Sequence, residues 1–508
     1  MFSQIANRVN LKENSGILRI ILIYSIFFFT VALLKHYTFH SNAWDLSIFD
    51  ESIWNTTQDR FLFSNMKGYC YLGDHFAPVL LIFVPFYCLG FGAELLIFAQ
   101  VMFASLGALP LYWLAKDNFE DERLHYLFPL AYLLFLPLWH IITYDFHAVA
   151  LSIAPLIFAF YYLTKDKYLF SLLFLAFAVT CKENMPVVGA FFGIYILLVK
   201  KKKLLGFCLL AMGLLLFIVE LQHLIPFFRG GEQGFAYFDR YSYLGNNLGE
   251  YVKTALFNPL IIVKNLLIPD KIIYLTVMLG AAAFLPLFSP STFFLAIPIL
   301  AQNLLSTYSG QYGYHSQYNS GLIPFLFISA IFGLSNILKN KTAEQQTQIK
   351  KRIQRIMVFF IIISLLEFFL GYFIRYTFPT KHTFYGHELL KQIPNHVSVS
   401  ASSNIHPHLA HRKNIWEFPN GVGQAEYVII ETFDPTWPME EKDYPDVLDR
   451  LWKEKSYKKL FGFFFLGEIR TPVRNKAEHF KEIEEFRQNK NYQILADKHQ
   501  FLLAKKIE

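Results

Sequence analysis

The stretches WDLSIFDESIWNTTQDR, Trp44 to Arg60, and YLGDHFAP, Tyr71 to Pro78, decide how the rest of the chain is interpreted. They follow the first apolar run directly and carry the carboxylates of Asp45, Asp50, Glu51, Asp59 and Asp74. Carboxylates beside a bilayer are costly unless they are paired or face water, because they lose hydration next to hydrocarbon. A polar segment that is kept in such a place predicts a functional loop.

The composition around this loop is that of a membrane protein. Of the 508 residues, 54% are hydrophobic and 17% are charged, with 55 Phe and 29 Tyr. The apolar residues gather into runs of roughly 16 to 22, the length that a helix needs to cross about 30 Å of hydrocarbon. The first run begins at Ile17, with Arg8 and Lys12 before it and Arg19 near its start, and has no small-residue cleavage pattern after it. We therefore expect a retained anchor and a cytoplasmic N-terminus.

The net charge of +7 does not indicate nucleic-acid binding. The Lys and Arg residues lie in short loops between apolar runs, where they set the orientation of the chain in the membrane. The four cysteines fit neither a disulfide framework nor a zinc spacing. We expect no nucleic-acid partner and assign no metal ligand.

Charge also decides how many of the twelve apolar runs cross the membrane. The runs cover 17–34, 76–91, 94–115, 124–142, 148–163, 168–181, 186–199, 204–222, 271–287, 291–305, 320–338 and 356–373. If the second run crossed, the four lysines at 200–203 would lie outside, against the positive-inside rule. Its proline and glycine residues permit an interfacial or re-entrant helix instead. We predict about eleven transmembrane helices within residues 1–374, with interfacial helices and a first outer loop at 35–93.

This topology places the polar clusters of the chain on the outer face. They are WDLSIFDE at 44–51, GDHF at 73–76, YDFH at 144–147, CKEN at 181–184 and YGYHSQY at 312–318, together with the long loop from 223 to 270. Ionisable residues at membrane depth normally face protein or water. The clusters are therefore predicted to line one outward-facing cavity.

From about Arg375 the composition changes, because charged residues rise and the apolar runs shorten to strand length. Strands are predicted at 396–402, 425–432, 461–469, 492–497 and 501–506, and helices at 444–455 and 475–488. The segment 375–508 is thus predicted to be a small extracytoplasmic α/β domain that caps the membrane site or binds substrate.

Asp45 is the first candidate for a catalytic residue. It begins a helical pattern, so the alternative is an N-cap that accepts hydrogen bonds from free amide groups. Asp50 and Glu51 fall about 140° and 240° around a regular helix from Asp45, so a two-carboxylate metal site has weak support. Asp50 is the second candidate for the base. A divalent metal cofactor is an open alternative with weak support.

Further candidates lie at helix ends, and each has a structural alternative. Asp74 and His75 could supply a second acid or a ligand, or could meet lipid headgroups. Asp145 and His147 have a spacing that suits a turn. Lys182 and Glu183 form either a neutralised ion pair or, through the Lys182 ammonium, a phosphate-binding group.

The remaining candidates are Arg229 and Arg240, as anion contacts, and Tyr314, His315 and Tyr318, as sugar or phosphate contacts. Tyrosine is also an ordinary interface residue of membrane proteins. The three histidines of NIHPHLAHR, at 406, 408 and 411, invite a zinc hypothesis, but their spacing fits no standard site.

Several of these motifs, in this order, resemble the bacterial predicted-membrane-protein family called domain of unknown function 2079. They are AWDLSIFDESIW at 43–54, LGDHFAPVLLIFVPFY at 72–87, ALPLYWLAKDNF at 108–119, YDFHAVALSIAPL at 144–156, CKENMPVV at 181–188, FDRYSYLG at 238–245 and YHSQYNSGLIPF at 314–325. That family is similar to the membrane glycosyltransferases of the GT-C type, which place a catalytic acid in the first outer loop and take sugar from a polyprenyl-phosphate donor.

The resemblance implies a GT-C-like fold and places Asp45 at the position of the catalytic acid, with Phe49 at a frequent aromatic position. The segment Asp74 to Leu80 resembles the stretch before the interfacial helix. The chain departs from the pattern where Leu46 replaces a frequent acidic residue and where Ala77-Pro78 replaces a double proline. These departures bear on activity and acceptor class.

We interpret the chain as an inverting glycosyltransferase of the bacterial inner membrane. Its expected partners are a polyprenyl-phosphate-linked sugar donor, membrane lipid and an extracytoplasmic acceptor. Asp45 would take the acceptor proton, while Lys182 would bind phosphate. The alternative is a transporter, or a lipid-binding or scaffold protein of the cell envelope, in which the same ionisable residues bind a substrate or relay protons. No internal repeat of the transporter kind is visible.

Overall fold

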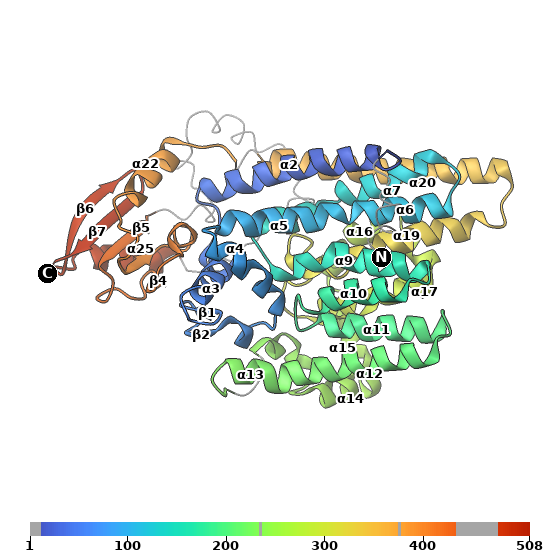
Figure 1. Cartoon of the computed structure of the whole chain (residues 1–508), viewed down its shortest axis with the longest axis horizontal. Helices are drawn as coiled ribbons and strands as arrows, with labels where there is room; N and C mark the ends of the chain where they lie inside the picture. The colour runs from blue at the N-terminus through green and yellow to red at the C-terminus, as the bar shows by residue number, and fades with distance from the viewer. Residues whose placement is uncertain (1–11, 233–235, 374–376, 433–475, 508) are drawn as a thin grey trace. The chain divides into compact units, whose positions relative to one another are not determined.

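The computed structural model describes residues 12–232, 236–373, 377–432 and 476–507 (Figure 1). The chain divides into two compact units. The first comprises Met1–Thr30, Leu72–Ile82 and Leu95–Leu365, and the second comprises Val31–Tyr71, Phe83–Glu94 and Leu366–Glu508. Most of the first outer loop predicted from the sequence therefore belongs to one unit with the C-terminal segment.

The first unit is built from helices, since an apolar segment can satisfy its backbone groups within a helix. Including those that run into the second unit, they are α2 (Ser15–Tyr37), α5 (Ala93–Leu106), α6 (Ala108–Asn118), α7 (Glu122–Leu133), α8 (Leu136–Tyr144), α9 (Ile153–Thr164), α10 (Tyr168–Val179), α11 (Met185–Leu198), α12 (Lys203–Val219), α13 (Ile225–Phe228), α14 (Leu248–Phe257), α15 (Pro259–Leu266), α16 (Pro269–Gly280), α17 (Pro290–Phe293), α18 (Ile297–Leu305), α19 (Ile323–Leu338) and α20 (Ala343–Glu367). Shorter turns of helix are η2 (Tyr71–Gly73), η3 (Pro78–Phe83), η4 (Ala148–Ser152), η5 (Glu220–Leu224), η6 (Ala236–Leu244), η7 (Leu285–Phe288), η8 (Phe294–Ala296) and η9 (Gln317–Asn319). After α20, η10 (Phe368–Phe373) belongs to the second unit.

Among the residues that the structure describes, three helices are long and apolar enough to cross a membrane: Ser15–Tyr37, Ala93–Asn118 and Lys203–Phe228. The pair α7 and α8, bent by 44° between Leu133 and Leu136, would make a fourth. Other predicted runs form apolar helices of 10–17 residues, which are Pro78–Cys88, Ala148–Thr164, Tyr168–Val179, Met185–Leu198, Pro290–Leu305 and Ile323–Leu338. The count of eleven spans stays a prediction.

Two predicted runs differ in extent from the helices that form. The run 271–287 is not one helix, because α16 ends at Gly280 and the chain turns through Ala283 and Phe284, whose φ angles are 51° and 56°. Pro286 follows in η7, and a proline cannot continue the hydrogen bonding of a helix. In contrast, α20 begins at Ala343, between the basic residues Lys341 and Lys350, and continues into the last apolar run, 356–373.

Glycine residues let α11 and α12 approach closely. A Cβ atom on Gly193 would lie 2.5 Å from the amide nitrogen of Leu210, and one on Gly206 would lie 2.7 Å from the carbonyl oxygen of Gly193. Small residues at such contacts are the usual means by which membrane helices pack. This packing holds α11 against α12, and α11 begins directly after the Lys182–Glu183 turn.

The second unit contains the helical segment η1 (Ala43–Ser47) and α3 (Ile48–Thr56), the hairpin β1 (Phe63–Ser64) and β2 (Tyr69–Cys70), and α4 (Val84–Cys88). Its C-terminal part contains α22 (Lys381–Leu390), β3 (Val399–Ala401), η11 (His406–Leu409), β4 (Ile415–Glu417), β5 (Tyr427–Glu431), α25 (Lys476–Arg487), β6 (Tyr492–Lys498) and β7 (Phe501–Lys506). The strands form a mixed sheet in the order β4-β3-β5-β7-β6, in which β3 pairs in parallel with β4 and β5, while β7 is antiparallel to β5 and β6.

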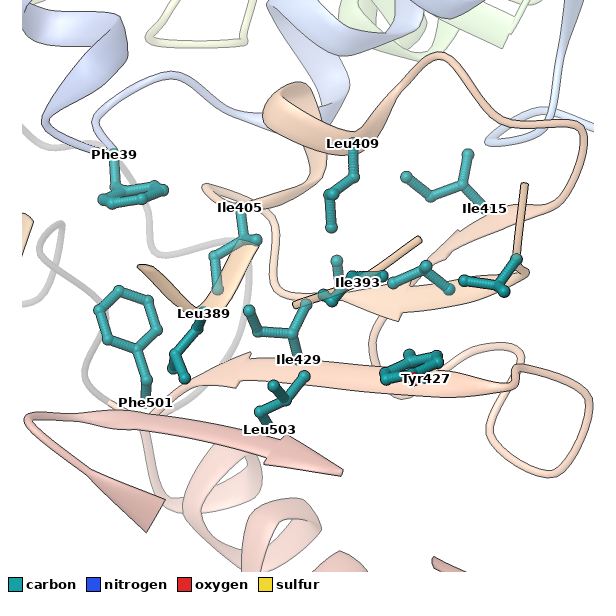
Figure 2. Close-up of a cluster of buried hydrophobic side chains, with 13 residues drawn as sticks. Phe39, Leu389, Ile393, Ile405, Leu409, Ile415, Tyr427, Ile429, Phe501 and Leu503 are labelled. Carbon is teal, nitrogen blue, oxygen red and sulfur yellow. The ribbon is translucent and has the colours of Figure 1, made fainter. Parts of the chain in front are cut away.

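Both faces of this sheet are covered, so the central strand β5 is buried throughout. Ile429 and Leu503 pack on one face with Leu389 of α22 and, from the end of α2, Phe39 (Figure 2). On the other face, Val428 and Ile430 pack with Ile483 and Phe486 of α25. Alternate residues of a strand point to opposite faces, which accounts for the two cores. Phe39 thus joins the first loop to the C-terminal core.

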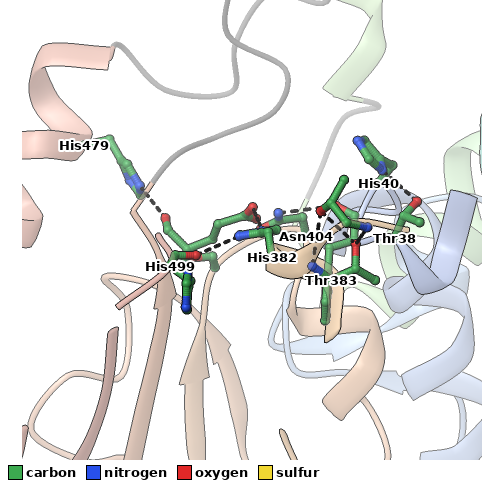
Figure 3. Close-up of polar contacts among 11 residues, drawn as sticks. Thr38, His40, His382, Thr383, Asn404, His479 and His499 are labelled. Atoms are coloured by element: carbon green, nitrogen blue, oxygen red, sulfur yellow. Dashed lines mark hydrogen bonds and ion pairs between the residues drawn. The ribbon is translucent and has the colours of Figure 1, made fainter. Parts of the chain in front are cut away.

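Polar contacts extend this connection within the second unit (Figure 3). The side-chain amide of Asn404 donates to the carbonyl of Phe39 at 3.3 Å. Nearby, His382 lies with Nε2 2.6 Å from the carboxylate of Glu431 and donates from Nδ1 to the carbonyl of His499 at 2.8 Å. Burial opposes charge on His382, but Glu431 outweighs burial and raises its pKa. His382, which forms an ion pair with Glu431 and a hydrogen bond through Nδ1 with His499, therefore ties α22 to the sheet.

The prediction of a small α/β domain at the C-terminus agrees with this sheet. The predicted strands at 396–402, 425–432 and 501–506 contain β3, β5 and β7, the strand predicted at 492–497 covers β6 except for Lys498, and the helix predicted at 475–488 contains α25. Strand β4 was not predicted, because its residues are only Ile415, Trp416 and Glu417. The predicted helix at 444–455 and strand at 461–469 lie outside the described residues.

Candidate functional site

Within the first unit, the turn carrying Asp74 and His75 meets the turn carrying Lys182 and Glu183. The imidazole Nδ1 of His75 lies 2.9 Å from the carboxylate of Glu183. The His75 ring stacks on Tyr237 with 4.8 Å between centroids, and the Tyr237 hydroxyl donates to the Asp74 carboxylate at 3.2 Å. Three segments that lie far apart in sequence therefore meet in one polar group.

Lys182 is buried at this place, with 8% of its surface exposed. Its ammonium lies 5.3 Å from the ring centre of Tyr318 and has no hydrogen-bond acceptor among the residues that the structure describes. Burial holds the pKa of Lys182 below its usual value, although Glu183 opposes this effect. Burial would raise the pKa of Glu183, but His75 and Lys182 outweigh it and lower that pKa. Glu183 is therefore an anion, and Lys182 keeps unused donor capacity.

Arg240 lies near the same group and is surrounded by aromatic rings. Its guanidinium is 4.5 Å from the ring centres of both Tyr237 and Tyr308, and Nη1 donates at 3.0 Å to Gln311 and to the hydroxyl of Tyr318. These partners are neutral, and no carboxylate in the described part of the chain forms an ion pair with Arg240. Its charge is therefore not cancelled locally. We call Asp74, His75, Lys182, Glu183, Tyr237, Arg240 and Tyr318 the Lys182 cluster.

Arg229 lies against the turn that carries Asp74. Its Nε donates to the carbonyl of Gly73 at 2.9 Å. A Cβ atom on Gly73 would lie 2.6 Å from the amide nitrogen of Arg229, so only glycine permits this close approach. Arg229 thus fixes the turn next to the Lys182 cluster.

Asp145 and His147 belong to a turn between α8 and η4 that Gln100 organises. The Gln100 side chain donates to the carbonyl of Asp145 at 2.9 Å and accepts from the amide of His147 at 2.8 Å. These bonds satisfy buried backbone groups where the helix is interrupted. The described contacts of this turn support the structural alternative for Asp145 and His147.

Tyr314 and His315 form a second group in the first unit. His315 Nδ1 lies 2.9 Å from His140 Nε2, and the ring centroids of Tyr314 and His315 are 3.8 Å apart. Burial and the neighbouring His140 both lower the pKa of His315. A neutral His315 is therefore a hydrogen-bonding group and not a cation for phosphate.

In the second unit, Asp45 lies in the first turn of the helical segment η1–α3. Asn42 caps this segment, because its side-chain oxygen accepts from the amide of Asp45 at 3.0 Å. The Asn42 amide group also donates to the Asp45 carboxylate at 2.6 Å. The N-cap alternative for Asp45 is therefore wrong, since Asn42 is the N-cap residue. The Asp45 side chain is partly exposed.

Asp50 is buried and engaged on the same helix. Its Oδ1 accepts from the Tyr87 hydroxyl at 2.7 Å and from Nε2 of His411 at 3.1 Å. Burial opposes charge on His411, but Asp50 outweighs it and raises the pKa of His411. Asp50 and His411 thus form an ion pair within the second unit.

The histidines of NIHPHLAHR do not converge on one point. His406 Nδ1 lies 2.7 Å from the hydroxyl of Ser47, the ring of His408 stacks on His36 at 4.2 Å, and His411 pairs with Asp50. The three rings point to different partners because Pro407 and η11 turn the chain between them. This arrangement agrees with the sequence pattern, which fits no zinc site.

Comparison with known proteins places the chain in a family. The family model described as "Predicted membrane protein (DUF2079)" matches residues 35–460. The chain belongs to this family. Among curated proteins, a search finds no match. Chains of ArnT from Cupriavidus metallidurans, bound to undecaprenyl phosphate and in the apo state, match this DUF2079 chain with a TM-score of 0.50 and 10% sequence identity. The match covers 97% of this chain and 98% of ArnT.

ArnT is a GT-C glycosyltransferase, so this DUF2079 protein is a membrane protein with a GT-C-like fold. At 10% identity the likeness shows the fold alone. The predicted membership and the resemblance to GT-C enzymes are confirmed. The roles of the candidate residues stay predictions.

The sequence analysis of this DUF2079 chain did not predict the environment of Glu51. Glu51 is fully buried and accepts from the Ser64 hydroxyl at 2.6 Å and the Met66 amide at 3.2 Å. Burial raises its pKa to about 7, although these hydrogen bonds act in the opposite direction. The helical spacing shows that Glu51 lies on another side from Asp45, but nothing in the sequence shows that the hairpin β1–β2 encloses it.

Proposed function

We propose that this protein is a glycosyltransferase that moves a sugar from a polyprenyl-phosphate donor to an extracytoplasmic acceptor, with inversion at the anomeric carbon. The fold is like that of ArnT, which was solved bound to undecaprenyl phosphate, and we propose a lipid phosphate of this class for the present chain. A bacterial inner-membrane location, with the N-terminus in the cytoplasm, belongs to the same proposal.

The observation that carries the proposal is the unused donor capacity of Lys182. Lys182 is a largely buried residue whose ammonium has no acceptor among the described residues, and an anion that accepts its hydrogen bonds would stabilise it. Arg240 adds a second uncancelled positive charge to the Lys182 cluster. Phosphate oxygens are strong acceptors for such groups. We assign phosphate binding to Lys182, with Arg240 and Arg229 in support.

The carboxylate of Asp45 is assigned the role of general base. It is partly exposed, whereas the Asp50 carboxylate is buried and already accepts from Tyr87 and His411. This difference supports Asp45 over Asp50 as the base, because a base must reach the proton that it takes. The Asn42 amide would hold the Asp45 carboxylate in one orientation.

In this mechanism the oxygen or nitrogen of the acceptor attacks the anomeric carbon of the donor. The new glycosidic bond forms as the bond from the anomeric carbon to the phosphate oxygen breaks. The acceptor proton passes to Asp45, and the electron pair of the broken bond stays with the lipid phosphate. Positive charge from the Lys182 cluster would stabilise that leaving group, so no general acid is needed.

Native mass spectrometry of the detergent-purified protein tests the lipid step. We expect a co-purified polyprenyl phosphate, or its sugar conjugate, in the wild type. Lys182→Ala should lose it, while Lys253→Ala, the same change at an exposed lysine of the first unit, should retain it. A wild type that folds without any lipid phosphate would contradict the proposal and favour a transporter or scaffold.

A further inference from the structure

Trp44 is more exposed than the residues that follow it in the helical segment Ala43–Thr56. Residues 46–53 of this segment are all buried, whereas 40% of Trp44 is exposed. Its neighbour Asp45 is also accessible in part. The indole ring of Trp44 therefore offers an accessible apolar face next to a partly exposed carboxylate.

The Trp44 ring is held in place by two residues of the same unit. Its Nε1 donates to the carboxylate of Glu417 at 2.9 Å. The ammonium of Lys67 lies 5.1 Å from the ring centre. Glu417 is the last residue of β4 and has 7% of its surface exposed, so it is a rigid anchor. A ring that is already fixed loses little conformational entropy when a ligand stacks on it.

We propose that Trp44 is the stacking platform for a pyranose ring of the acceptor, which makes the acceptor a saccharide. One face of a pyranose presents C–H groups that pack on an aromatic ring, while its hydroxyls need polar partners. Asp45, Lys67 and Glu417 supply such partners around Trp44. Glu417 is a positioning residue, because it acts on the ring. The term acceptor rests on the proposed function, but sugar binding can be measured without it.

The other candidate for covering Trp44 is the membrane interface, where tryptophan is common. An interfacial tryptophan directs its N–H group toward headgroups or water. Here the N–H group is already bonded to Glu417, and a cation lies over the ring. These contacts favour a sugar over lipid.

Saturation-transfer NMR on the full chain in lipid nanodiscs tests the proposal, since many detergents carry sugar headgroups. The probes are methyl β-D-glucopyranoside, methyl β-D-galactopyranoside and methyl α-D-mannopyranoside. We expect transfer to the ring C–H protons of at least one probe. Trp44→Leu should weaken binding about tenfold, because the stacking face is lost, and Trp44→Phe should weaken it less, because an aromatic face remains without its hydrogen bond to Glu417. Trp54→Phe, on the same helix, is the matched control.

Glu417 supplies a second, independent comparison. Glu417→Gln keeps an oxygen that accepts from Trp44 Nε1 and should bind the probe like the wild type. Glu417→Leu should weaken binding, although the Trp44 ring itself is still present. Thermal unfolding of each variant checks that the protein remains folded.

Two results would overturn the proposal. One is the absence of saturation transfer to all three probes in the folded wild type. The other is strong quenching of Trp44 fluorescence by brominated lipids, measured as the difference between wild type and Trp44→Phe, which would identify a membrane anchor. A folded wild type that binds a sugar probe but carries no co-purified lipid phosphate would refute the proposed transfer reaction and leave the sugar site standing.

Discussion

The imidazole of His75 lies 2.9 Å from the carboxylate of Glu183, across 108 residues of sequence. Glu183 also lowers the charge imbalance around Lys182, because its carboxylate is anionic and buried beside it. One carboxylate therefore contacts the His75 ring and lies beside the Lys182 ammonium, and its removal affects both.

Glu183→Ala is expected to destabilise the protein strongly, because it leaves Lys182 without its buried counter-charge and His75 without its hydrogen-bond partner. Loss of one partner from a buried pair costs on the order of 3–5 kcal/mol. Thermal unfolding in nanodiscs measures the effect, and Glu344→Ala, at an exposed position of α20, is the control. Equal midpoints for the two variants would contradict a structural role for the His75–Glu183 contact.

The Asp50–His411 pair predicts a pH dependence of stability. Asp50 raises the pKa of His411 above the ordinary value of 6.5. The stabilisation is therefore complete below about pH 6.5 and is lost as the pH rises through the raised pKa. His411 is 37% exposed, so solvent screening keeps the effect below about 1 kcal/mol. Between about pH 6 and 8.5, the thermal unfolding midpoint of His411→Gln should fall less with rising pH than that of the wild type. An equal pH dependence of the two midpoints would refute this role.

Glu51 predicts a separate pH effect in the same direction. Its pKa is raised to about 7 in the folded protein by burial, from an ordinary value of 4.5. The folded state thus holds the proton more tightly, and its stability falls as the pH rises through about 7. Glu51→Gln, which stays neutral and keeps an acceptor for Ser64, should remove this part of the pH dependence in unfolding scans. A Gln variant as pH-sensitive as the wild type would show that Glu51 does not titrate in this range.

Asp45→Asn is expected to abolish sugar transfer while leaving the fold intact. Loss of a general base typically lowers the rate by about 10²–10⁴-fold. The carboxamide oxygen of the variant could still accept from Asn42, so the thermal midpoint should change little. Transfer is measured with the sugar donor that native mass spectrometry identifies in the purified protein. Asp59→Asn, at an exposed site of the same loop, is the control. Full activity in Asp45→Asn would show that another residue is the general base.

The pairing of Lys182 with Glu183 could be predicted because the two residues are adjacent and lie between apolar runs. Their environment could not. His75 and Tyr237 reach Glu183 and Asp74 only after the turns of three distant segments meet, and that meeting depends on close packing, such as the contact between Gly73 and Arg229. The residue types of Asp50 and His411 likewise gave no sign that they would pair.

The sequence by itself determined that this is a helical membrane protein with a polar first loop and a C-terminal α/β segment. Apolar run length and strand patterning are local properties, and local physics is enough to interpret them. Only the tertiary structure decided that Asn42 and not Asp45 caps the helix, that Glu51 is enclosed, and that Glu417 fixes the ring of Trp44. Burial and charge pairing depend on segments that are remote in sequence, and the free energy of each side chain is set by what those segments place around it.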